Sequence, residues 1–386
     1  GDPTVGGSLE DRDAADIFSN WASLVRHLGI TRISGAVVAD DTFFTRQPMH
    51  PEWPRNERWK PYSAPASALS VNDNCVTIVC HPASETGAAA RLSVKPPVPL
   101  INLNNRLKTH NSRHVIWFQR PADSCTVTVG GRILHSSGGY SSRVTVPRPA
   151  LYAAQLFRLE LRDHGVRTAE EARRIPRKEP VDRSGWKQLV ERTMPLQPVL
   201  RTMLKHSQNH YAEQVLKTLG AEKSGTGSWK AGCRVASSYL QSIGVTNVQL
   251  SDGSGLSREN KLTAHALTEV LVHKADSPLG SRKADLLAVS GRDGTLESRL
   301  DSPPYRGAVR AKTGTLYGVK ALSGYVKSGK APRLAFSILC TCAEGRNGAM
   351  TRLQDALCRA LVNHLRSSKN AAQPPAGTVP SASTGR

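Results

Sequence analysis

The chain has 386 residues, too many for one ordinary hydrophobic core, so two or three domains are expected. Hydrophobic residues make up 39% and charged residues 22%, which is typical of a globular protein, and no apolar run approaches the ~20 residues of a membrane-spanning helix. Lys and Arg outnumber Asp and Glu by 52 to 31, and the resulting charge of +21 favours contact with polyanions. The basic residues are spread along the chain and aromatics are only 5%, so no nucleic-acid groove is predicted.

The seven cysteines do not predict a disulfide framework, because their number is odd and their spacing wide. Cys340 and Cys342 have no nearby His or second Cys pair, so no metal site is predicted. They end an alternating, strand-like run, and we expect them to be small buried side chains.

The first segments predict a small α/β unit. Ser8 and Asp11 could cap a helix whose apolar residues recur at helical spacing until Gly29 ends it. A strand and turn at 32–44 follow, and an amphipathic helix at 150–164 is expected to pack back on this unit. We therefore predict an inserted α/β domain, formed by residues 1–66 and 147–178.

Residues 67–146 have the alternating pattern of short strands, and Gly130-Gly131 resembles a hairpin turn. This region is predicted to be a separate, inserted β-rich domain. The predicted strands are CVTIVC (75–80), ARLSV (90–94), HVIWF (114–118), CTVTVGGRIL (125–134) and SRVTV (142–146).

The C-terminal region contains two predicted helices separated by a polar segment, His206-Ser207-Gln208-Asn209. The first begins at Pro195, and the second continues to Gly220. The last residues, 367–386, are of low complexity and are predicted to be a disordered tail.

Two short motifs could carry chemistry. Ser-x-Asn occurs three times, but only Ser207–Asn209 lies between two helical stripes, from which side chains can converge on a cleft. Lys312-Thr313-Gly314 precedes a strand-like run and is expected only about once in several thousand residues. On an edge strand, Gly314 would leave one face bare for a substrate backbone, with a hydroxyl and a positive charge beside it. The alternative is an ordinary exposed strand start.

Ser-x-Asn followed by Lys-Thr-Gly-Thr-Leu resembles the penicillin-recognising serine transferases. Within them, the chain is similar to the D-alanyl-D-alanine carboxypeptidase/endopeptidase family, the class C low-molecular-mass penicillin-binding proteins. The likeness covers nearly the whole chain. Its segments are GDPTVGG (1–7), YSAPASALSVNDNCV (62–76), MPLQPVLRTMLKHSQNHYAEQVLKTLG (194–220), LSDGSGLSRENKLT (250–263), SGRDGTLESRL (290–300) and AKTGTLYGVKALSGYV (311–326).

The resemblance implies an α/β (α+β) fold of the serine β-lactamase/transpeptidase type, with helices packed on an antiparallel sheet. Residues 179–366 would be the C-terminal part of the catalytic domain, and the α/β and β-rich domains would be insertions. It also implies three catalytic residues. Ser207 would relay a proton to the leaving D-alanine nitrogen, Asn209 would hold the substrate's peptide group, and Lys312 would steer the substrate carboxylate.

Three neighbouring residues are implied to bind substrate. Thr313 would hydrogen-bond the carboxylate, Gly314 would admit the substrate backbone, and the backbone N–H of Thr315 would form half of the oxyanion hole. Gln208 is expected to point away. Asp252 and Arg258 are interpreted as a turn and its brace. Arg299, His206 and His210 are assigned no role, and the two histidines are expected to be exposed at helix ends.

In this family the nucleophile is the serine of a Ser-x-x-Lys motif upstream of the inserted domains. The one match here is Ser184–Lys187, which lies after the insertions in a segment expected to be extended. The chain starts at GDPTVGG without a methionine, so we expect a truncated sequence that lacks its nucleophile and is inactive alone. A natural pseudoenzyme is the alternative.

The function implied is that of a serine-type D-Ala-D-Ala carboxypeptidase/endopeptidase. It would act on peptidoglycan stem peptides through an acyl-serine intermediate, without metal or cofactor, and β-lactam antibiotics would inhibit it. A periplasmic or cell-envelope location is implied as well. The main alternative is a non-catalytic module that binds peptidoglycan peptides. A β-lactamase is disfavoured, because the insertions suit the peptidase family and no deacylating glutamate motif is visible.

Overall fold

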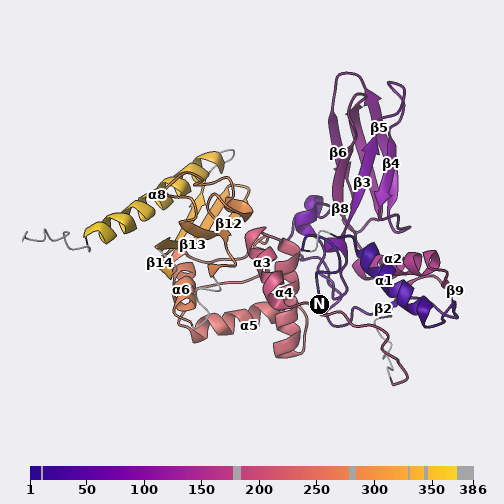
Figure 1. The fold of residues 1–386 in the computed structure, drawn as a ribbon, viewed down its shortest axis with the longest axis horizontal. Coiled ribbons are helices and arrows are strands. Elements are labelled where there is room, and N and C mark those ends of the chain that lie inside the picture. Colours follow the sequence, from indigo (N-terminus) through magenta and orange to yellow (C-terminus); the bar gives the residue numbers. More distant parts are fainter. Residues whose placement is uncertain (10–11, 177–183, 278–283, 329–330, 343–346, 372–386) are drawn as a thin grey trace, which may run out of the picture. The chain divides into compact units, whose positions relative to one another are not determined.

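The computed structural model describes residues 1–9, 12–176, 184–277, 284–328, 331–342 and 347–371. The chain divides into two compact units. Figure 1 shows the ribbon with colours that follow the sequence. The first comprises residues 1–203, 208–242 and 248–261, and the second comprises 204–207, 243–247 and the chain from 262 onward. The division falls inside the polar segment 206–209, and the predicted domain boundaries stay a prediction. None of the described helices has the length and apolar composition needed to cross a membrane.

The first unit begins with a helix pair, α1 (Ala14–His27) and α2 (Pro149–Asp163), which pack together through Phe18 and Phe157 with ring centroids 5.3 Å apart. The predicted cap of α1 is wrong, because the Asp13 side chain accepts the hydrogen bond from the backbone N–H of Ala15. Ser8 lies outside the helix, and Asp11 lies outside the described residues.

The predicted strand at 32–44 forms two short pieces, each paired in parallel with a segment that follows α2. The pairs are β1 (Arg32–Ile33) with β9 (Arg167–Thr168), and β2 (Val38–Ala39) with β10 (Arg173–Arg174). Three short 3-10 helices lie between β2 and the next strand along the chain: η1 (Arg55–Glu57), η2 (Pro61–Ser63) and η3 (Asn72–Asn74).

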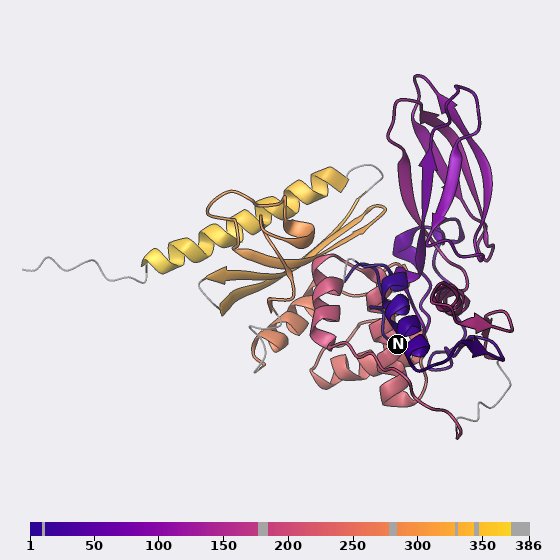
Figure 2. The same ribbon diagram turned by 45° about the vertical axis from the view of Figure 1, so that its right-hand side comes forward.

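The β-rich region consists of two three-stranded sheets, visible together in Figure 2. One is antiparallel, with β3 (Cys75–His81) between β4 (Arg91–Lys95) and β8 (Tyr140–Thr145). In the other, β7 (Thr126–Leu134) lies between β5 (Asn102–His110), which is parallel to it, and β6 (Val115–Gln119), which is antiparallel. One hydrophobic core serves both sheets, with fully buried Ile78, Leu107, Val127, Ile133 and Val144.

Two sequence expectations fail in this region. Gly130-Gly131 is not a turn, because both glycines lie within β7. β5 was not predicted, because its sequence, NLNNRLKTH, is mostly polar and only its second half alternates in burial.

Three helices complete the first unit and lead into the second: α3 (Leu196–Lys205), α4 (Asn209–Ser224) and α5 (Trp229–Ser242). Helix α4 does not stop at Gly220, as predicted, but ends at Gly225, whose φ of +68° is left-handed. Gly220 instead allows α5 to approach, because a Cβ there would lie 2.7 Å from the backbone N of Gly232.

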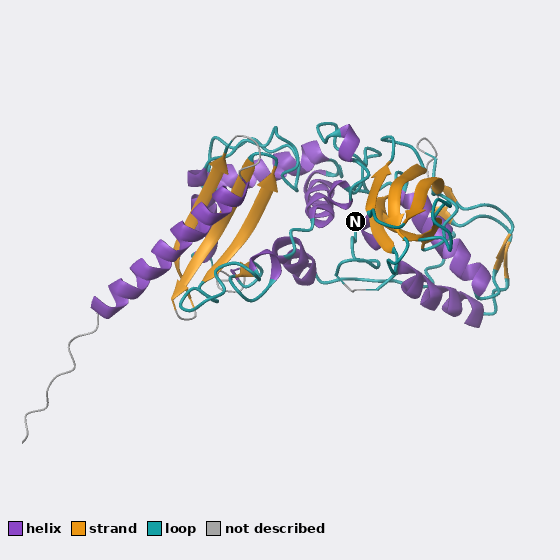
Figure 3. Cartoon of the chain, turned by 90° about the horizontal axis from the view of Figure 1, so that it is seen from above, coloured by secondary structure: helices purple, strands orange, loops and turns teal. Residues whose placement is uncertain are grey.

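The second unit is a four-stranded antiparallel sheet with helices on both faces (Figure 3). Its strands, in spatial and sequence order, are β11 (Ala288–Val289), β12 (Val309–Leu316), β13 (Val319–Ser328) and β14 (Ala331–Thr341). Its helices are α6 (Ala264–Ala275), η4 (Gly294–Leu296) and α8 (Asn347–Ala371).

Alternate residues of β13 face the two helical layers. Leu322 and Val326 share a buried cluster with Cys358 and Val362 of α8. Tyr325 faces the other side, where its hydroxyl donates to the carbonyl of Leu271 in α6 at 2.8 Å. Helix α8 extends through Ala371, five residues into the predicted tail, and residues 372–386 lie outside the described part.

All seven cysteines are free thiols, and the described residues contain no group of side chains that could hold a metal ion. Cys340 and Cys342 are only partly buried, contrary to the expectation.

Candidate active site

Ser207 of the polar segment is joined directly to the Lys-Thr-Gly strand. It lies between α3 and α4 with a φ of 56°, in the left-handed region that non-glycine residues rarely adopt. Its Oγ accepts a hydrogen bond from Lys312 Nζ at 2.6 Å, and both residues belong to the second unit. Strained backbone held in place by its surroundings is common at functional sites. The structure thus brings together one residue from each of the two sequence motifs.

Lys312 is held in a way that favours proton exchange. Its ammonium group also donates to the backbone carbonyl of Thr313 at 2.6 Å. No described carboxylate forms an ion pair with it, and burial lowers the pKa of the Lys312 ammonium to about 8. The group is therefore mostly charged at neutral pH, yet it releases a proton far more readily than an ordinary lysine.

The hydroxyl of Thr313 has a partner that sequence reasoning did not identify. Thr313 Oγ1 donates to Thr295 Oγ1 at 2.9 Å, and Thr295 lies in the short helix η4. The two hydroxyls form an exposed pair beside Lys312 in the second unit. The signal in the sequence was the segment SGRDGTLESRL, which contributed to the family resemblance without a role for its threonine.

The loop that carries Thr295 is fixed to the end of α3. Lys205 forms an ion pair with Asp293, whose other carboxylate oxygen accepts from the backbone N–H of Val289 at 2.9 Å. Gly294 lies so close that a Cβ there would be 2.5 Å from the carbonyl oxygen of Lys205. The helix end that leads into Ser207 and the loop that presents Thr295 are therefore one rigid assembly.

Part of β12 is an edge strand, which is the arrangement in which Gly314 would leave one face bare. Strand β11 pairs only with Arg310 and Ala311, whereas β13 pairs with the whole of β12. In the described part of the chain, the outer side of residues 312–316 has no strand partner. A Cβ on Gly314 would touch only Ala321 of the neighbouring strand, at 3.1 Å. This edge can accept an extended peptide by backbone hydrogen bonding.

The other site residues make contacts of their own. The Thr315 hydroxyl accepts from Lys320 Nζ at 2.9 Å. Asn209 belongs to the first unit, where its side-chain amide donates to the carbonyl of Tyr62 at 3.0 Å. Gln208, also in the first unit, donates to the hydroxyl of Ser8 at 2.7 Å.

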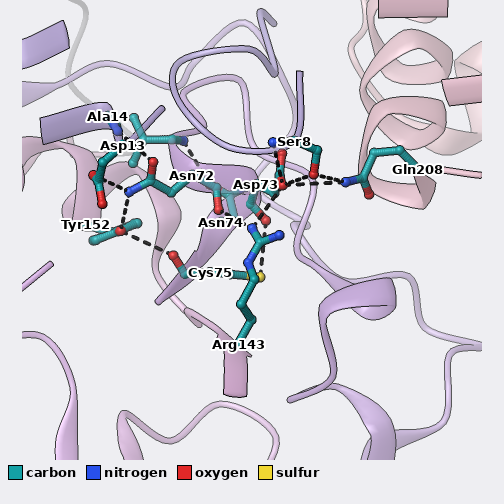
Figure 4. A network of polar contacts seen from close by, with 11 residues as sticks. Ser8, Asp13, Ala14, Asn72, Asp73, Asn74, Cys75, Arg143, Tyr152 and Gln208 are labelled. Carbon is teal, nitrogen blue, oxygen red and sulfur yellow. Dashed lines mark hydrogen bonds and ion pairs between the residues drawn. The ribbon is translucent and has the colours of Figure 1, made fainter. Parts of the chain in front are cut away.

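The Ser70–Asn72 motif is a structural anchor (Figure 4). Asn72, Asp73 and Asn74 all have left-handed φ angles of 52–54°. The Asn72 side chain accepts from the N–H of Ala14 at 2.7 Å and donates to the hydroxyl of Tyr152 at 3.1 Å, which ties α1 and α2 to the start of β3. The carboxylate of Asp73 pairs with Arg143 at 2.9 Å and accepts from Ser8, the partner of Gln208.

The two histidines beside the polar segment differ. His206 is exposed, as expected, but His210 is wrongly predicted, because it is buried in α4. Burial lowers the pKa of His210 to about 4, so the ring is neutral at physiological pH. It lies inside the first unit next to Gln214 and has the character of a core residue.

Asp252 organises a turn, as predicted. Its carboxylate accepts from the N–H groups of Gly255 and Ser257 at 2.8 and 2.6 Å, and from Trp53 Nε1 at 2.9 Å. Arg299 is structural too, since it pairs with Asp355 of α8 at 2.7 Å.

Glu213 is a buried carboxylate that the sequence did not reveal. It accepts from Trp229 Nε1 at 2.7 Å and from the backbone N–H groups of Gly253 and Ser254 at 3.0 and 2.8 Å. Burial, together with nearby Asp252, raises the pKa of Glu213. It joins α4, α5 and the loop that follows them within the first unit.

Ser184 and Lys187 lie in an exposed stretch that is neither helix nor strand. They are therefore not arranged on a helical turn, as a Ser-x-x-Lys nucleophile and its base require.

Comparison with known proteins identifies the family. Residues 1–360 match the D-Ala-D-Ala carboxypeptidase 3 (S13) family. The chain is 32% identical to the D-alanyl-D-alanine carboxypeptidase of Actinomadura sp. (strain R39) over 381 residues, which cover 94% of this chain and 68% of that protein. The chain belongs to the S13 family of D-Ala-D-Ala carboxypeptidases.

A further relative and two solved structures are also similar to this chain. The chain is 26% identical to the D-alanyl-D-alanine carboxypeptidase DacB of Haemophilus influenzae over 84% of its own length and 68% of that protein. The crystal structure of penicillin binding protein 4 (dacB) from the same organism aligns with a TM-score of 0.78 and 22% identity, over 94% of this chain and 80% of that one. A complex of that protein with a β-lactam aligns with a TM-score of 0.73 and 21% identity, covering 94% and 79%. The predicted family and the mixed α/β, transpeptidase-like fold are thereby confirmed.

Proposed function

We propose that this S13 chain carries the proton-relay and carboxylate-binding part of the active site of a serine-type D-Ala-D-Ala carboxypeptidase/endopeptidase. Its substrates would be peptidoglycan stem peptides that end in D-Ala-D-Ala. The observation that carries the proposal is the 2.6 Å contact between Ser207 Oγ and Lys312 Nζ. This contact places a hydroxyl against a lysine whose lowered pKa suits proton transfer near neutral pH.

The chemical step needs a proton at the leaving nitrogen. As a serine nucleophile attacks the peptide carbonyl, its hydroxyl proton passes to the lysine of its Ser-x-x-Lys motif. When the C–N bond then breaks, the departing D-alanine nitrogen takes the proton of Ser207 Oγ. The Ser207 oxygen then takes a proton from Lys312 Nζ, to which it is hydrogen-bonded. Water then adds its hydroxyl group to the acyl carbon and its proton to the serine oxygen, which returns the nucleophile and releases the shortened peptide. Proton exchange with solvent restores the starting charge of both lysines.

The groups beside Ser207 and Lys312 can bind two parts of the substrate, its terminal carboxylate and its backbone. Lys312 and the Thr313 hydroxyl would bind the terminal carboxylate, since both can donate to an anion, and Thr295 would position Thr313 through their hydrogen bond. The substrate backbone would lie along the open edge of residues 312–316, where the N–H of Thr315 would contribute to the oxyanion hole. Asn209 would hold the substrate's peptide group.

The acylated serine is proposed to lie in a Ser-x-x-Lys segment outside these 386 residues. Ser184–Lys187 is the one match within them, and its exposed, non-helical segment does not suit the role. The 386-residue chain by itself would then be inactive. We place the protein in the cell envelope, where its charge of +21 would hold it near anionic polymers.

Labelling with a fluorescent penicillin, followed by intact mass measurement and peptide mapping, tests this proposal. The 386-residue chain is expected to remain unlabelled, and the chain extended upstream along its reading frame is expected to be labelled at a Ser-x-x-Lys serine. An adduct on Ser184 would contradict the assignment of the nucleophile. An extended chain that binds D-Ala-D-Ala peptides without ever being labelled would instead be a non-catalytic binding protein.

A further inference from the structure

The sheet β5–β7–β6 has an outward face built from three transverse rows of residues. In the strand register, Trp117, Gly130 and Arg106 form the middle row, because residues paired across strands point to the same side. The row on one side contains Val115, Arg132 and Lys108, and the row on the other contains Gln119, Thr128 and Asn104. We call these nine residues the outer β face.

The burial pattern confirms which way these residues point. The interleaved Leu107, Val127, Val129 and Ile133 are buried, whereas the large side chains of the outer β face are exposed. Asn104 Nδ2 donates to Thr128 Oγ1 at 3.2 Å, across two strands of the same face. The three rows extend over about 13 Å along the strands.

Trp117 forms a flat platform at the centre of this face. A Cβ on Gly130 would lie 2.1–2.6 Å from three atoms of the six-membered ring of the indole, so the ring rests on the bare backbone of β7. Its side chain is nevertheless 42% exposed. Among the described residues, no hydrogen-bond acceptor contacts the indole N–H. The glycine thus supports an aromatic surface whose other side is open.

The cationic side chains beside Trp117 have no hydrogen-bond or ion-pair partner among the described residues. Arg106, Lys108 and Arg132 are exposed, and none of their side chains forms a hydrogen bond or ion pair with a described residue. Other arginines of this region are engaged, since Arg143 pairs with Asp73 and Arg120 donates to Thr145. Residues 67–146 contain eight Lys and Arg against three Asp and Glu. The outer β face therefore offers three free positive charges around one aromatic ring.

We propose that the outer β face binds a carboxylate-bearing glycan strand, namely the polymer part of peptidoglycan. The choice of this polymer rests on the proposed function. A sugar ring would stack on Trp117, the carboxylates of the attached peptides would pair with Arg106, Lys108 and Arg132, and the sugar hydroxyls would bond to Asn104, Thr128 and Gln119.

A glycan fits this face better than a nucleic acid does. Single-stranded nucleic acids are held by successive aromatic side chains that stack successive bases, and this face has a single aromatic residue. The row of amides and a hydroxyl suits the many hydroxyl groups of a sugar. Binding here would keep the enzyme on its polymeric substrate without any contact with the reacting atoms.

Co-sedimentation of the 386-residue protein with purified, peptide-bearing peptidoglycan sacculi, over a range of salt concentrations, tests the proposal. Trp117→Ala and the triple variant Arg106→Ser, Lys108→Ser, Arg132→Ser are each expected to weaken binding about tenfold or more. The triple variant is also expected to flatten the salt dependence, whereas Trp117→Ala is expected to keep it. The matched control is the triple variant Arg91→Ser, Lys95→Ser, Lys230→Ser, which removes three exposed charges elsewhere on the first unit and is expected to bind as the wild type does.

Gly130→Ala provides a second variant that keeps every functional group. Its added methyl displaces the indole from β7, so sacculus binding is expected to fall as it does for Trp117→Ala. Circular dichroism and thermal melting of each variant verify folding. Unchanged binding by folded Trp117→Ala and Gly130→Ala, equal losses in the control triple variant, or tighter binding to an oligonucleotide than to sacculi would overturn the proposal.

Release of D-alanine from a small soluble peptide by the upstream-extended protein separates this proposal from the proposed function. The variants of the outer β face are expected to leave that rate unchanged. Loss of sacculus binding with full activity on the soluble peptide supports the glycan site. If sacculus binding depends on Trp117 but the protein never releases D-alanine, the proposed function is contradicted while the glycan site is still supported.

Discussion

At the scale of single residues, the proposed mechanism depends on the pair Ser207 and Lys312. The sequence motifs identify both residues but not their contact, because 105 positions of chain separate them. The strained φ of Ser207 could not be predicted either, since serine rarely adopts it. Both features depend on tertiary contacts of residues 204–207 within the second unit, such as the ion pair of Lys205 with Asp293.

The charge of Lys312 predicts a pH dependence. Burial lowers the pKa of Lys312 from its ordinary value of 10.5 to about 8, so the positive charge is present below pH 8 and is lost above it. In the upstream-extended protein, the KM for a peptide with a free terminal carboxylate should therefore rise as pH increases through 8. A peptide with an amidated terminus is the control and should not show this rise. A KM that stays constant up to pH 10 for the free carboxylate contradicts the role.

Thr295 is expected to act as a positioning residue through its hydrogen bond to Thr313. Thr295→Val keeps the shape and removes the hydroxyl, so the KM should rise by about 5–10-fold, equivalent to roughly 1 kcal/mol, with kcat little changed. Thr295→Ser restores the hydroxyl and should restore the KM. Equal losses in the Val and Ser variants would indicate that only the packing of this residue matters.

At the scale of elements, α4 is tied to its neighbours through Glu213. Glu213→Ala removes three hydrogen-bond acceptor contacts, to Trp229, Gly253 and Ser254, in a buried place. The unsatisfied donors should lower the free energy of unfolding by about 3 kcal/mol. Urea denaturation of the 386-residue chain measures this change. Glu222→Ala, an exposed position on the same helix, is the matched control and should change it by less than about 0.5 kcal/mol.

Glycine is the residue for which sequence interpretation failed most clearly at this scale. Gly130-Gly131 and Gly220 have the patterns of a turn and of a helix end, but in the structure they admit Trp117 and α5, respectively. Local sequence cannot separate these uses, because in both cases glycine is selected for its missing side chain. Glu213 was unpredictable for a similar reason, since its donors come from distant segments.

At the scale of the whole molecule, the sequence predicts the fold class and the family well. Ordered segments such as YSAPASALSVNDNCV and AKTGTLYGVKALSGYV carry the family resemblance, and the match over residues 1–360 confirms it. The helices α1, α2, α3 and α4 and most strands of residues 75–145 follow from their apolar periodicity. The helices α5, α6 and α8 were not predicted, and neither was β5, because the identity of its neighbours decides its structure. The candidate site could be predicted as a set of residues but not as a geometry, since Thr295 and Lys205 depend on tertiary contacts.

The most direct test of the central claim is the rate of D-alanine release from a peptide ending in D-Ala-D-Ala, measured for the upstream-extended protein with and without the Ser207→Ala change. General acid–base catalysis typically contributes 10²–10⁴-fold to a rate. If Ser207 relays the proton to the leaving nitrogen, the variant should be slower by at least about 100-fold while remaining folded. Release at the wild-type rate by the folded Ser207→Ala protein would contradict the account.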